Sequence, residues 1–226
     1  RPNDSIAYYQ NSHWSFIPFP TDITSMITNF ELAAFGDSIV PTVGTSSGFF
    51  TYRQNKWKKF TTSDGLVHNY INNLTSNGNK IYISTEKGIS IYDGVKFDNS
   101  INDLLPAQSK DIRSIIFSKN QNGKDIPLIF GDEWIGSIKN NKLKILIDNL
   151  NLRWSPVFQR AIFFIDKRGR IYFGNTSAKF YIDEKTDERV HLGVDNGFIS
   201  DGANSMFIDR EENIWSSYGR GVDKIS

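Results

Sequence analysis

The sequence predicts an all-β protein of the β-propeller class, and three observations lead to this prediction. Apolar residues alternate with period two, as at Ile81 and Ile83 or at Ile89 and Ile91, which is typical of strands with one buried face. Polar turns rich in Gly and Asn separate these short stretches. One pattern of strands and turns also recurs along the chain, and aromatic residues, which favour strands, make up 14% of it.

The recurring pattern is clearest between Ile165–Asp183 and Ile208–Ser226, which align without a gap at an offset of 43 residues. Five copies place a small residue at one strand position, with spacings of 40, 47, 43 and 43 residues: Gly44, Ser84, Gly131, Gly174 and Ser217. A helical solenoid would show a 3.6-residue period, and an immunoglobulin-type sandwich would not repeat its own sequence. Four short strands at this interval are typical of propeller blades.

Each copy contains four strands, which we name a to d from the axis of the propeller to its rim. In the second copy, strand a is "NNLTSN", and a Gly-Asn turn leads to strand b, "KIYIST". The polar turn "EK" precedes strand c, "GISIY", and a second turn, "DG", leads to the short strand d, "VKF". Turn residues at each junction make a four-stranded antiparallel meander the expected unit.

The whole chain, residues 1–226, is expected to be one propeller domain or propeller segment. Complete repeats are predicted at about 24–66, 67–106, 107–152 and 153–202, with partial repeats at 6–20 and 203–226. Aligning Tyr9 with Tyr52 and Trp14 with Trp57 places strands c and d at the N-terminal end, whereas the last copy ends after strand c. The sequence therefore allows either a closed five-bladed ring or an arc of a larger, seven-bladed propeller.

An arc would leave sheet edges open, and open edges favour pairing with another chain. A homodimer or a second chain that contains propeller blades is therefore an expected partner. Nucleic acid is excluded as a partner, because 26 basic and 25 acidic residues give a net charge of +1 without any block of like charges. No apolar run is long enough for membrane insertion. The opening residues "RPNDS" carry no initiator Met and no secretory apolar core, as expected of a mature or excised segment.

Metal and cofactor chemistry have little support in the sequence. The chain has no cysteine, and its three histidines, His13, His68 and His191, lack the spacing of a ligand set. The turns "DKRG" (166–169) and "DREE" (209–212) resemble calcium loops, but cationic side chains occupy positions where oxygen ligands would be needed. We expect no cofactor and no bound metal. The absence of cysteine permits an oxidising compartment without requiring one.

An enzymatic function has little support in the sequence. Asp132 and Glu133 are a carboxylate pair of the kind that glycoside hydrolysis requires, but neighbouring strand or turn residues usually point apart. The sequence has no nucleophile elbow, phosphate-binding loop or zinc-protease motif. The chain is therefore expected not to be an enzyme, with a polysaccharide-active enzyme as the least favoured alternative.

Two stretches, Asn55–Gly94 and Asp195–Ile225, resemble the two-component regulator propeller repeat. Both combine a "DGL"-type loop, an "N-x-I"-type strand a, a strand b and a Gly-led strand c. The resemblance is weak between Ile112 and Leu150. It implies an extracytoplasmic, periplasmic or extracellular sensor module of a bacterial histidine kinase or hybrid two-component system, which often recognises glycan fragments. The alternative is a protein-interaction scaffold of the cell surface or secretion machinery.

A ligand site is expected on the face that carries the b–c turns and the d–a loops, which we call the top face. These turns differ in charge and size while the strands keep one pattern, as expected of a scaffold with a grafted site. Trp134 and Tyr218 are candidates for stacking on a sugar ring. The polar candidates are Glu86, Lys87, Arg113, Asp132, Glu133, Arg160, Asn175 and Arg220. The alternative for any one of them is an ordinary wet turn, and Trp134 could instead cap a degraded blade.

The aromatic residues at strand b and d positions are expected to form the core between sheets and not a binding surface. This expectation covers Trp14, Trp57, Tyr82, Tyr172 and Trp215. The loops "DGL" (64–66) and "DNGF" (195–198) are interpreted as turns, in which Gly adopts a positive φ and Asp bonds its own backbone.

Overall fold

The computed structural model confirms the all-β prediction. It describes residues 5–10, 12–19, 25–107, 110–119, 124–148, 162–174, 178–183, 186, 188–219 and 221–225. Within these ranges the chain forms strands and three short 3₁₀ helices. No helix in these ranges is long and apolar enough to cross a membrane.

The strands form six antiparallel sheets in chain order, and every sheet is a meander of sequential neighbours. The N-terminal hairpin comprises β1 (Ser5–Gln10) and β2 (His13–Pro18). Sheet 1 comprises β3 (Ile27–Phe35), β4 (Ser38–Thr45), β5 (Gly48–Arg53) and β6 (Lys56–Phe60). Sheet 2 comprises β7 (Ile71–Asn77), β8 (Lys80–Thr85), β9 (Gly88–Tyr92) and β10 (Phe97–Asp98).

The second half of the chain continues the same order. Sheet 3 comprises β11 (Ile112–Lys119), β12 (Asp125–Gly131), β13 (Ile135–Lys139) and β14 (Lys142–Ile147). Sheet 4 comprises β15 (Ile162–Ile165), β16 (Arg170–Gly174), β17 (Lys179–Asp183) and β18 (Glu188–His191). Sheet 5 has three strands, β19 (Ser205–Ile208), β20 (Ile214–Tyr218) and β21 (Gly221–Ile225). The 3₁₀ helices are η1 (Thr62–Asp64), η2 (Ser100–Leu104) and η3 (Val194–Asn196).

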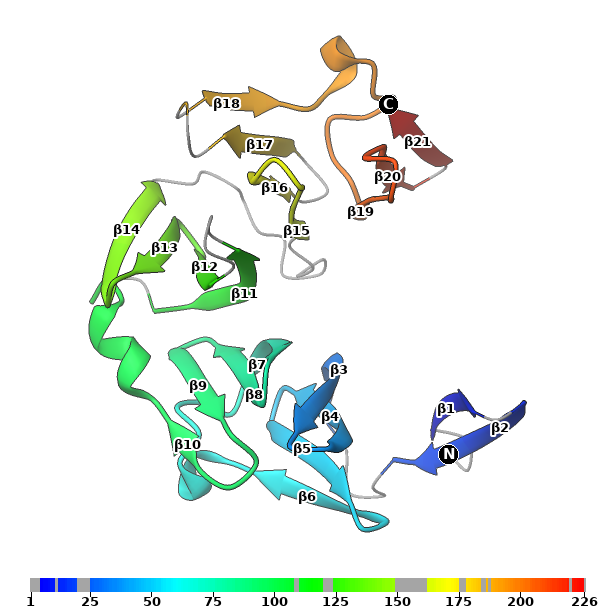
Figure 1. Cartoon of the computed structure of the whole chain (residues 1–226), viewed down its shortest axis with the longest axis vertical. Coiled ribbons are helices and arrows are strands. Elements are labelled where there is room, and N and C mark those ends of the chain that lie inside the picture. Colours follow the sequence, from blue (N-terminus) through cyan, green and yellow to red (C-terminus); the bar gives the residue numbers. More distant parts are fainter. Residues whose placement is uncertain are drawn as a thin grey trace.

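The sheets fan around a common axis in an open arc (Figure 1). The first strands β3, β7, β11, β15 and β19 contact one another in succession, so strand a of each sheet lies innermost, as in a propeller. The hairpin β1–β2 and sheet 5 stand at opposite ends of the arc and do not share a sheet. Of the two arrangements left open by the sequence, the described residues adopt the arc and not the closed ring.

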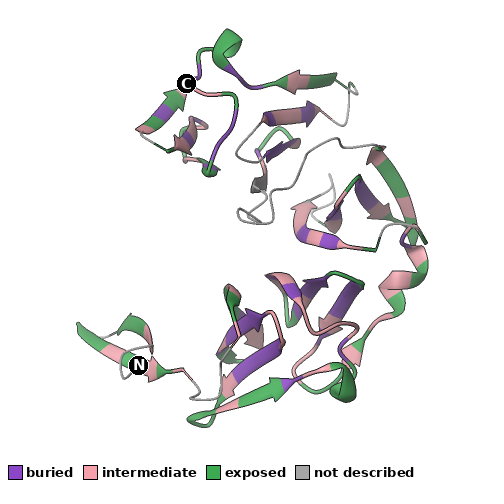
Figure 2. Cartoon of the chain, turned by 180° about the vertical axis from the view of Figure 1, so that it is seen from behind, coloured by how far each residue is buried: buried purple, intermediate pink, exposed green. Residues whose placement is uncertain are grey.

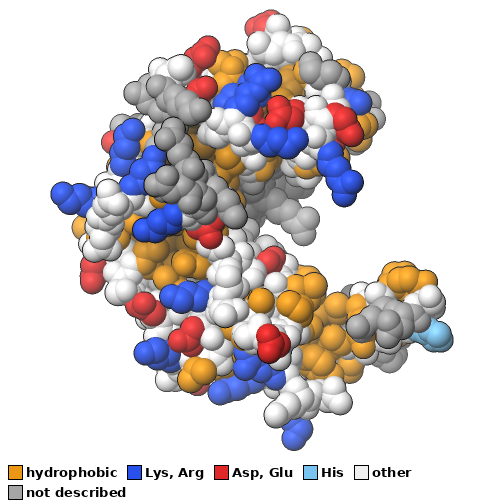
Figure 3. All heavy atoms as spheres, in the orientation of Figure 1, with side chains coloured by type: hydrophobic (Ala, Val, Ile, Leu, Met, Phe, Trp, Pro, Cys, Tyr) orange, Lys and Arg blue, Asp and Glu red, His pale blue; other side chains and the backbone are white. Residues whose placement is uncertain are grey.

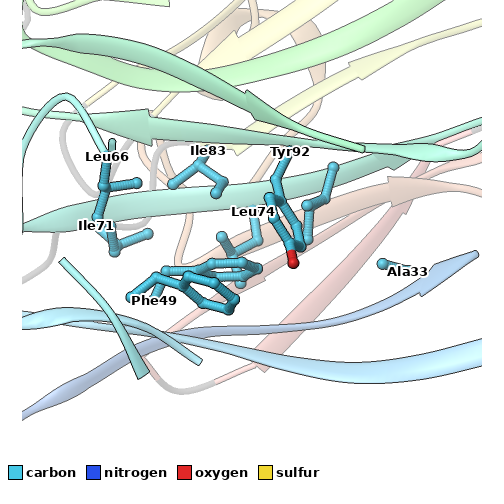
Figure 4. Packing of buried hydrophobic residues seen from close by; sticks show 9 residues of the cluster. Ala33, Phe49, Leu66, Ile71, Leu74, Ile83 and Tyr92 are labelled. Carbon is cyan, nitrogen blue, oxygen red and sulfur yellow. The ribbon is translucent and has the colours of Figure 1, made fainter. Parts of the chain in front are cut away.

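The hydrophobic core consists of seams between successive sheets, and exposed residues follow the rim (Figure 2). Between sheets 1 and 2, Phe49 of β5 packs with Leu74, Ile83 and Tyr92, which are all buried (Figure 4). The period-two pattern explains this seam, because alternate residues of a strand point to opposite sides of its sheet. Each complete sheet therefore has one side toward the preceding sheet and one toward the following sheet.

The two "DGL"-type loops have the predicted turn chemistry. Gly65 and Gly197 adopt φ values of 103° and 89°, a region that costs glycine little. In the first loop, the Asp64 carboxylate accepts the Thr61 N–H at 2.9 Å. In the second, Asn196 and not Asp195 takes this position, where its side-chain oxygen accepts from the backbone at 3.4 Å.

The two a–b turns that resemble calcium loops use their aspartates as hydrogen-bond acceptors within the turn. The Asp166 carboxylate accepts the N–H groups of Arg168 and Arg170 at 3.0 and 2.8 Å. The Asp209 carboxylate accepts the Asn213 N–H at 2.9 Å and the Trp215 indole N–H at 2.8 Å. These bonds hold the pKa of Asp209 at about 2, with the Trp215 indole as the largest cause. Both carboxylates therefore stabilise the turn.

The expectation that the strand aromatics form the inter-sheet core is confirmed in part. Tyr172 is fully buried, and Tyr82 packs against Phe117 of the next sheet with ring centroids 4.8 Å apart. For Trp14 the expectation is wrong, because its side chain is 66% exposed. No described residue covers the side of the hairpin from which Trp14 projects, so the seam that would bury it is incomplete.

Candidate functional site: a polar cluster between sheets 2 and 3

The top face follows from the meander of each sheet. Successive strands run in opposite directions, so the b–c turn and the d–a loop of a sheet lie at the same end. At this end, the first strands of sheets 1, 2 and 3 each contain a β-bulge, between Ile27 and Asn29, Ile71 and Asn73, and Ile112 and Ser114. Bulges re-aim side chains and are frequent beside functional sites.

The residues at the three bulges, Thr28, Asn72 and Arg113, lie at the top of the innermost strands. Two of them have buried polar atoms without a hydrogen-bond partner in the described part of the chain, namely the Thr28 hydroxyl and the Arg113 Nε. An unsatisfied buried polar atom is costly in a structural role. The top of the innermost strands is therefore a candidate ligand-binding region.

Asn72 and Arg113 both contact Asp111, in the loop that leads into β11. The Asn72 Nδ2 donates to the Asp111 carboxylate at 2.8 Å and to the Ile112 carbonyl at 2.9 Å. The Arg113 guanidinium lies 2.8 Å from the other carboxylate oxygen of Asp111. We call Asn72, Asp111 and Arg113, together with Glu86 and Asp132, the seam cluster, because it bridges sheets 2 and 3.

The charge of Asp111 depends on its neighbours. Burial raises the pKa of Asp111, whereas the Arg113 charge and the Asn72 hydrogen bond lower it. Asp132 and Glu86 raise it further, although they come from the b–c turns of different sheets. Asp132 and Glu86 are thus close enough to act on the Asp111 carboxyl group, and the cluster contains three carboxyl groups and one guanidinium.

The cluster continues toward the d–a loop of sheet 2. The Glu86 carboxylate lies 4.0 Å from the Nδ1 of His68, and both side chains are partly exposed. The His68 Nδ1 accepts the Tyr70 N–H at 3.3 Å, which orients the ring. Carboxylates accept hydrogen bonds from hydroxyl groups, and a guanidinium donates in a fixed fork. This arrangement suits a polar ligand with several hydroxyl groups.

The structure places the predicted site residues in several different environments. Glu86, Arg113 and Asp132 come together in the seam cluster. Lys87 and Glu133 are exposed beside it, and Tyr218 lies at the end of β20, far along the chain in sheet 5. Arg160, Asn175 and Arg220 lie outside the described residues.

The prediction that Trp134 stacks on a ligand is wrong. Its side chain is only 3% exposed and packs with Ile112, Ile115 and Ile129 in the core of the seam. Gly131 makes room for the indole, since a Cβ at this position would overlap the ring. The alternative that Trp134 caps a degraded blade is the one that the structure supports.

Asn72 and Asp111 were not among the site residues predicted from the sequence. Both lie one residue from a buried isoleucine, Ile71 or Ile112, at the start of strand a. A bulge is not visible in an alternating pattern, because it shifts the register by one residue locally. The recurrence of a polar residue directly after that isoleucine, as Asn72 and Arg113, was an available signal for Asn72. Asp111 precedes its isoleucine and has no such signal.

The described residues hold no group of three or more His, Cys, Asp or Glu side chains with metal-site geometry.

Comparison with known proteins supports the fold. No protein-family model and no curated protein sequence matches the chain. Among solved structures, the extracellular domain of the one-component system BT4673 from B. thetaiotaomicron matches with a TM-score of 0.70 and 19% identity, over 92% of this chain and 28% of that chain. A second structure describes BT4673 as a hybrid two-component system and matches with a TM-score of 0.68.

Two further structures show how widely this fold is used. PorZ, a surface component of the type-IX secretion system of Porphyromonas gingivalis, matches with a TM-score of 0.60 and 12% identity, over 97% of this chain and 35% of that chain. Virginiamycin B lyase from Staphylococcus aureus matches with a TM-score of 0.58 and 11% identity, over 91% of this chain and 68% of that chain.

The fold and these similarities define the class of the protein as a β-propeller. The chain spans less than a third of the length of the BT4673 domain. At this level of identity, the likeness to extracellular sensor domains holds for the fold, which is compatible with the resemblance to the two-component regulator propeller repeat.

Proposed function

We propose that the chain is a ligand-sensing propeller segment of a bacterial extracytoplasmic sensor, located in the periplasm or outside the cell. The seam cluster on the top face is the proposed binding site, and a carbohydrate is the proposed ligand class. The observation that carries the proposal is the bridge from Asn72 and Arg113 to the half-buried Asp111 carboxylate, between two sheets. The similarity to the BT4673 extracellular domain supports a sensor role.

The ligand chemistry follows from the donor and acceptor set. Glu86 and Asp132 come from exposed b–c turns and can accept hydroxyl hydrogens, and Arg113 can donate from its guanidinium. With Trp134 buried in the core, this site recognises its ligand through hydrogen bonds and not through that indole. The acidic balance disfavours anionic ligands.

A ligand at this site would contact two sheets at once. Binding that favours one arrangement of the seam over another shifts the population of that arrangement, in proportion to the difference in affinity. In our proposal, further domains of the sensor read this shift. The chain itself carries out no chemistry on the ligand.

The test is a thermal-shift screen of the chain against a panel of oligosaccharides. A ligand at 100 times its Kd adds about 2.7 kcal/mol to the stability of the folded state, which raises the Tm by several degrees. We expect Glu86→Gln and Asp132→Asn to remove this shift without lowering the Tm of the free protein. The matched control is Glu211→Gln, which changes an exposed carboxylate in the a–b turn of sheet 5.

The proposal is wrong if no oligosaccharide shifts the Tm, or if the two seam-cluster variants respond as the control does. An accompanying assay for reducing ends released from the same oligosaccharides addresses the enzymatic alternative. Turnover by the wild type that is lost in Asp132→Asn would replace the sensor with a polysaccharide-active enzyme.

A second candidate function is a protein-interaction scaffold at the cell surface. The similarity to PorZ is one reason to retain it. The other is the large exposed apolar side chains near the N-terminal end, which include Trp14, Phe16 and Leu32. A monomeric soluble protein rarely exposes such a group without a partner.

A further inference from the structure

The N-terminal hairpin has the structure of the outer half of a propeller sheet. In β1–β2, the rings of Tyr9 and Trp14 lie 5.3 Å apart at 52°. In β5–β6, the rings of Tyr52 and Trp57 lie 5.0 Å apart at 51°. The hairpin therefore repeats strands c and d of sheet 1, and strands a and b of its own sheet are absent from the described residues.

The hairpin covers the outer part of sheet 1. The Trp57 indole donates to the Pro18 carbonyl at 2.8 Å, and its ring stacks on Phe19 with centroids 6.0 Å apart. These contacts fix the hairpin on the side of sheet 1 that points away from sheet 2. Pro18 and Phe19, at the end of strand d of the hairpin, thus contact Trp57 at the rim of sheet 1.

The inner part of the same side of sheet 1 is only partly covered, since Val43, which pairs with Phe30, is buried and three other apolar side chains are exposed. Phe30, Leu32 and Ile39 are 42%, 52% and 65% exposed. The equivalent of Phe30 in sheet 2 is Leu74, since Phe30 pairs with Val43 as Leu74 pairs with Ile83. Leu74 is only 3% exposed. Figure 3 shows hydrophobic side chains gathered over sheet 1 where it faces the hairpin.

The internal seams show what covers such a side. On sheet 2, the cover is sheet 1, whose first strand contributes Ala33 to the cluster that contains Leu74. On sheet 3, Tyr82 of β8 packs on Phe117. In both seams, an inner strand of the preceding sheet, β3 or β8, contacts the first strand of the following sheet.

In sheet 5, strands a and b form the hairpin β19–β20, and the side of this hairpin that would face a following sheet carries aromatic side chains. Phe207 of β19 stacks on Trp215 of β20, with centroids 6.0 Å apart and planes at 2°, and Phe207 is 55% exposed. Tyr82 and Trp215 occupy the same position of strand b, one residue after the isoleucines Ile81 and Ile214. The turn of β19–β20 is held by Asp209.

We propose that Phe30, Leu32 and Ile39, together with the free edge of β1, bind an antiparallel β-hairpin of a further propeller sheet, supplied from outside the described residues. We call this the inner docking surface. The hairpin would add to β1 by main-chain hydrogen bonds and place aromatic or branched side chains on Leu32 and Phe30. Strand addition of this kind combines main-chain bonding with specific side-chain contacts. The proposal is independent of the seam cluster and of its ligand.

The first test uses a fluorescent peptide with the sequence of β19–β20, Ser205–Tyr218, closed by a disulfide between added terminal cysteines. Titration of the chain into this peptide is followed by anisotropy. We expect saturable binding to the wild type and at least a tenfold weaker affinity for Leu32→Glu. Val95→Glu changes an exposed apolar residue of the β9–β10 turn, which is not part of the inner docking surface, and this variant should bind as the wild type does. The peptide with Phe207→Ser should bind at least tenfold more weakly.

The second test does not depend on the stability of the free peptide. The same hairpin sequence is fused to Arg1 through a flexible linker, which gives it a high effective concentration at the surface. We expect the fusion to raise the urea midpoint and to slow hydrogen exchange of the β1 amides. The Leu32→Glu variant of the fusion should show neither effect.

Three outcomes would overturn the proposal. One is a fusion with an unchanged midpoint together with no peptide binding. Another is equal binding by Leu32→Glu and Val95→Glu. The third is concentration-dependent dimerisation of the wild type alone that Leu32→Glu abolishes, because a second copy would then be the occupant. None of these results alters the oligosaccharide screen, so failure here and failure of the sensor proposal are distinguishable.

Discussion

Two seams of the propeller place very different residues at the same repeat position. Ile89 in strand c of sheet 2 lies opposite Ser84, and Lys179 in strand c of sheet 4 lies opposite Gly174. Both side chains are fully buried. Ile89 packs into the apolar seam between sheets 2 and 3. Lys179 instead extends its ammonium group toward the d–a loop that leads into sheet 5.

The lysine binds this loop through the backbone. The Lys179 Nζ donates to the Ser200 carbonyl and, at 3.4 Å, to the Gly202 carbonyl. It also lies 4.2 Å from the centroid of the Phe198 ring. The second seam thus ties a loop in place with a buried cation where the first relies on close packing. The comparison teaches that a propeller tolerates a charge in a seam when main-chain carbonyls satisfy it.

The largest effect is expected for Ile89→Ala, which breaks the apolar side of the comparison. Removing a buried isoleucine leaves a cavity, which costs about 2–5 kcal/mol. Urea denaturation measures this as a lower midpoint with an unchanged slope. The control is Val95→Ala, an exposed residue in a turn, for which we expect a change within about 0.5 kcal/mol. A midpoint for Ile89→Ala equal to that of the control would show that the seam does not depend on packing at this position.

A smaller loss is expected for Lys179→Met, which keeps an unbranched side chain up to the ε carbon and removes the cation. The carbonyls of Ser200 and Gly202 then lose a donor, at about 1–3 kcal/mol for buried groups left unpaired. Hydrogen exchange should increase in the loop 193–203 and remain unchanged in the loop 61–70. Equal exchange in both loops would contradict the role of Lys179 as a clamp.

The pH dependence of stability tests the burial of the Lys179 cation in a second way. Burial lowers the pKa of Lys179 below 10.5, against the opposing effect of Asp223 and Asp201. In the window between the folded and unfolded pKa, the unfolded chain binds more protons than the folded chain. Stability therefore rises with pH there, because the cost of burying the charge is relieved. Subtracting the profile of Lys179→Met isolates this slope, and a flat difference up to pH 10.5 would be evidence against a depressed pKa.

The smallest effect is expected at the opposite end of the sheet 4–sheet 5 seam. There the Lys167 Nζ donates to the Arg210 carbonyl at 2.9 Å and lies 4.0 Å from Glu212. The Lys167 side chain is exposed, so Lys167→Ala should cost at most about 1 kcal/mol, and this cost should decrease with added salt. A loss as large as that of Lys179→Met would mean that the exposed end of the seam contributes as much as the buried cation.

Much of the fold could be predicted because its signals are local. The alternation at Ile81 and Ile83 marks one side of a strand, and Gly65 marks a turn that needs a positive φ. The repetition of these signals then predicts the four-stranded sheets, which the structure confirms. Part of the candidate site was also predictable, since Glu86 and Asp132 lie in polar b–c turns.

The remaining features depend on contacts with residues of other strands and loops, which are not near neighbours in the sequence. Trp134 reads as an exposed turn aromatic, yet isoleucines of β11 and β12 bury it. The sequence pattern indicates an exposed charge at Lys179, but the next d–a loop buries this side chain. Asp111 gains its role from Asn72, 39 residues earlier. A sequence pattern does not show which side of a strand meets which neighbour.

The sequence by itself determined where the strands and turns lie, because the pleat of a strand and the φ preference of a turn residue depend only on near neighbours. Only the tertiary structure decided which side of each sheet is covered and which polar groups meet across a seam. Burial depends on the sheet that lies opposite, and that sheet comes from another repeat. The same physical reason leaves Trp14 and Leu32 exposed at the N-terminal end, where no described sheet lies opposite them.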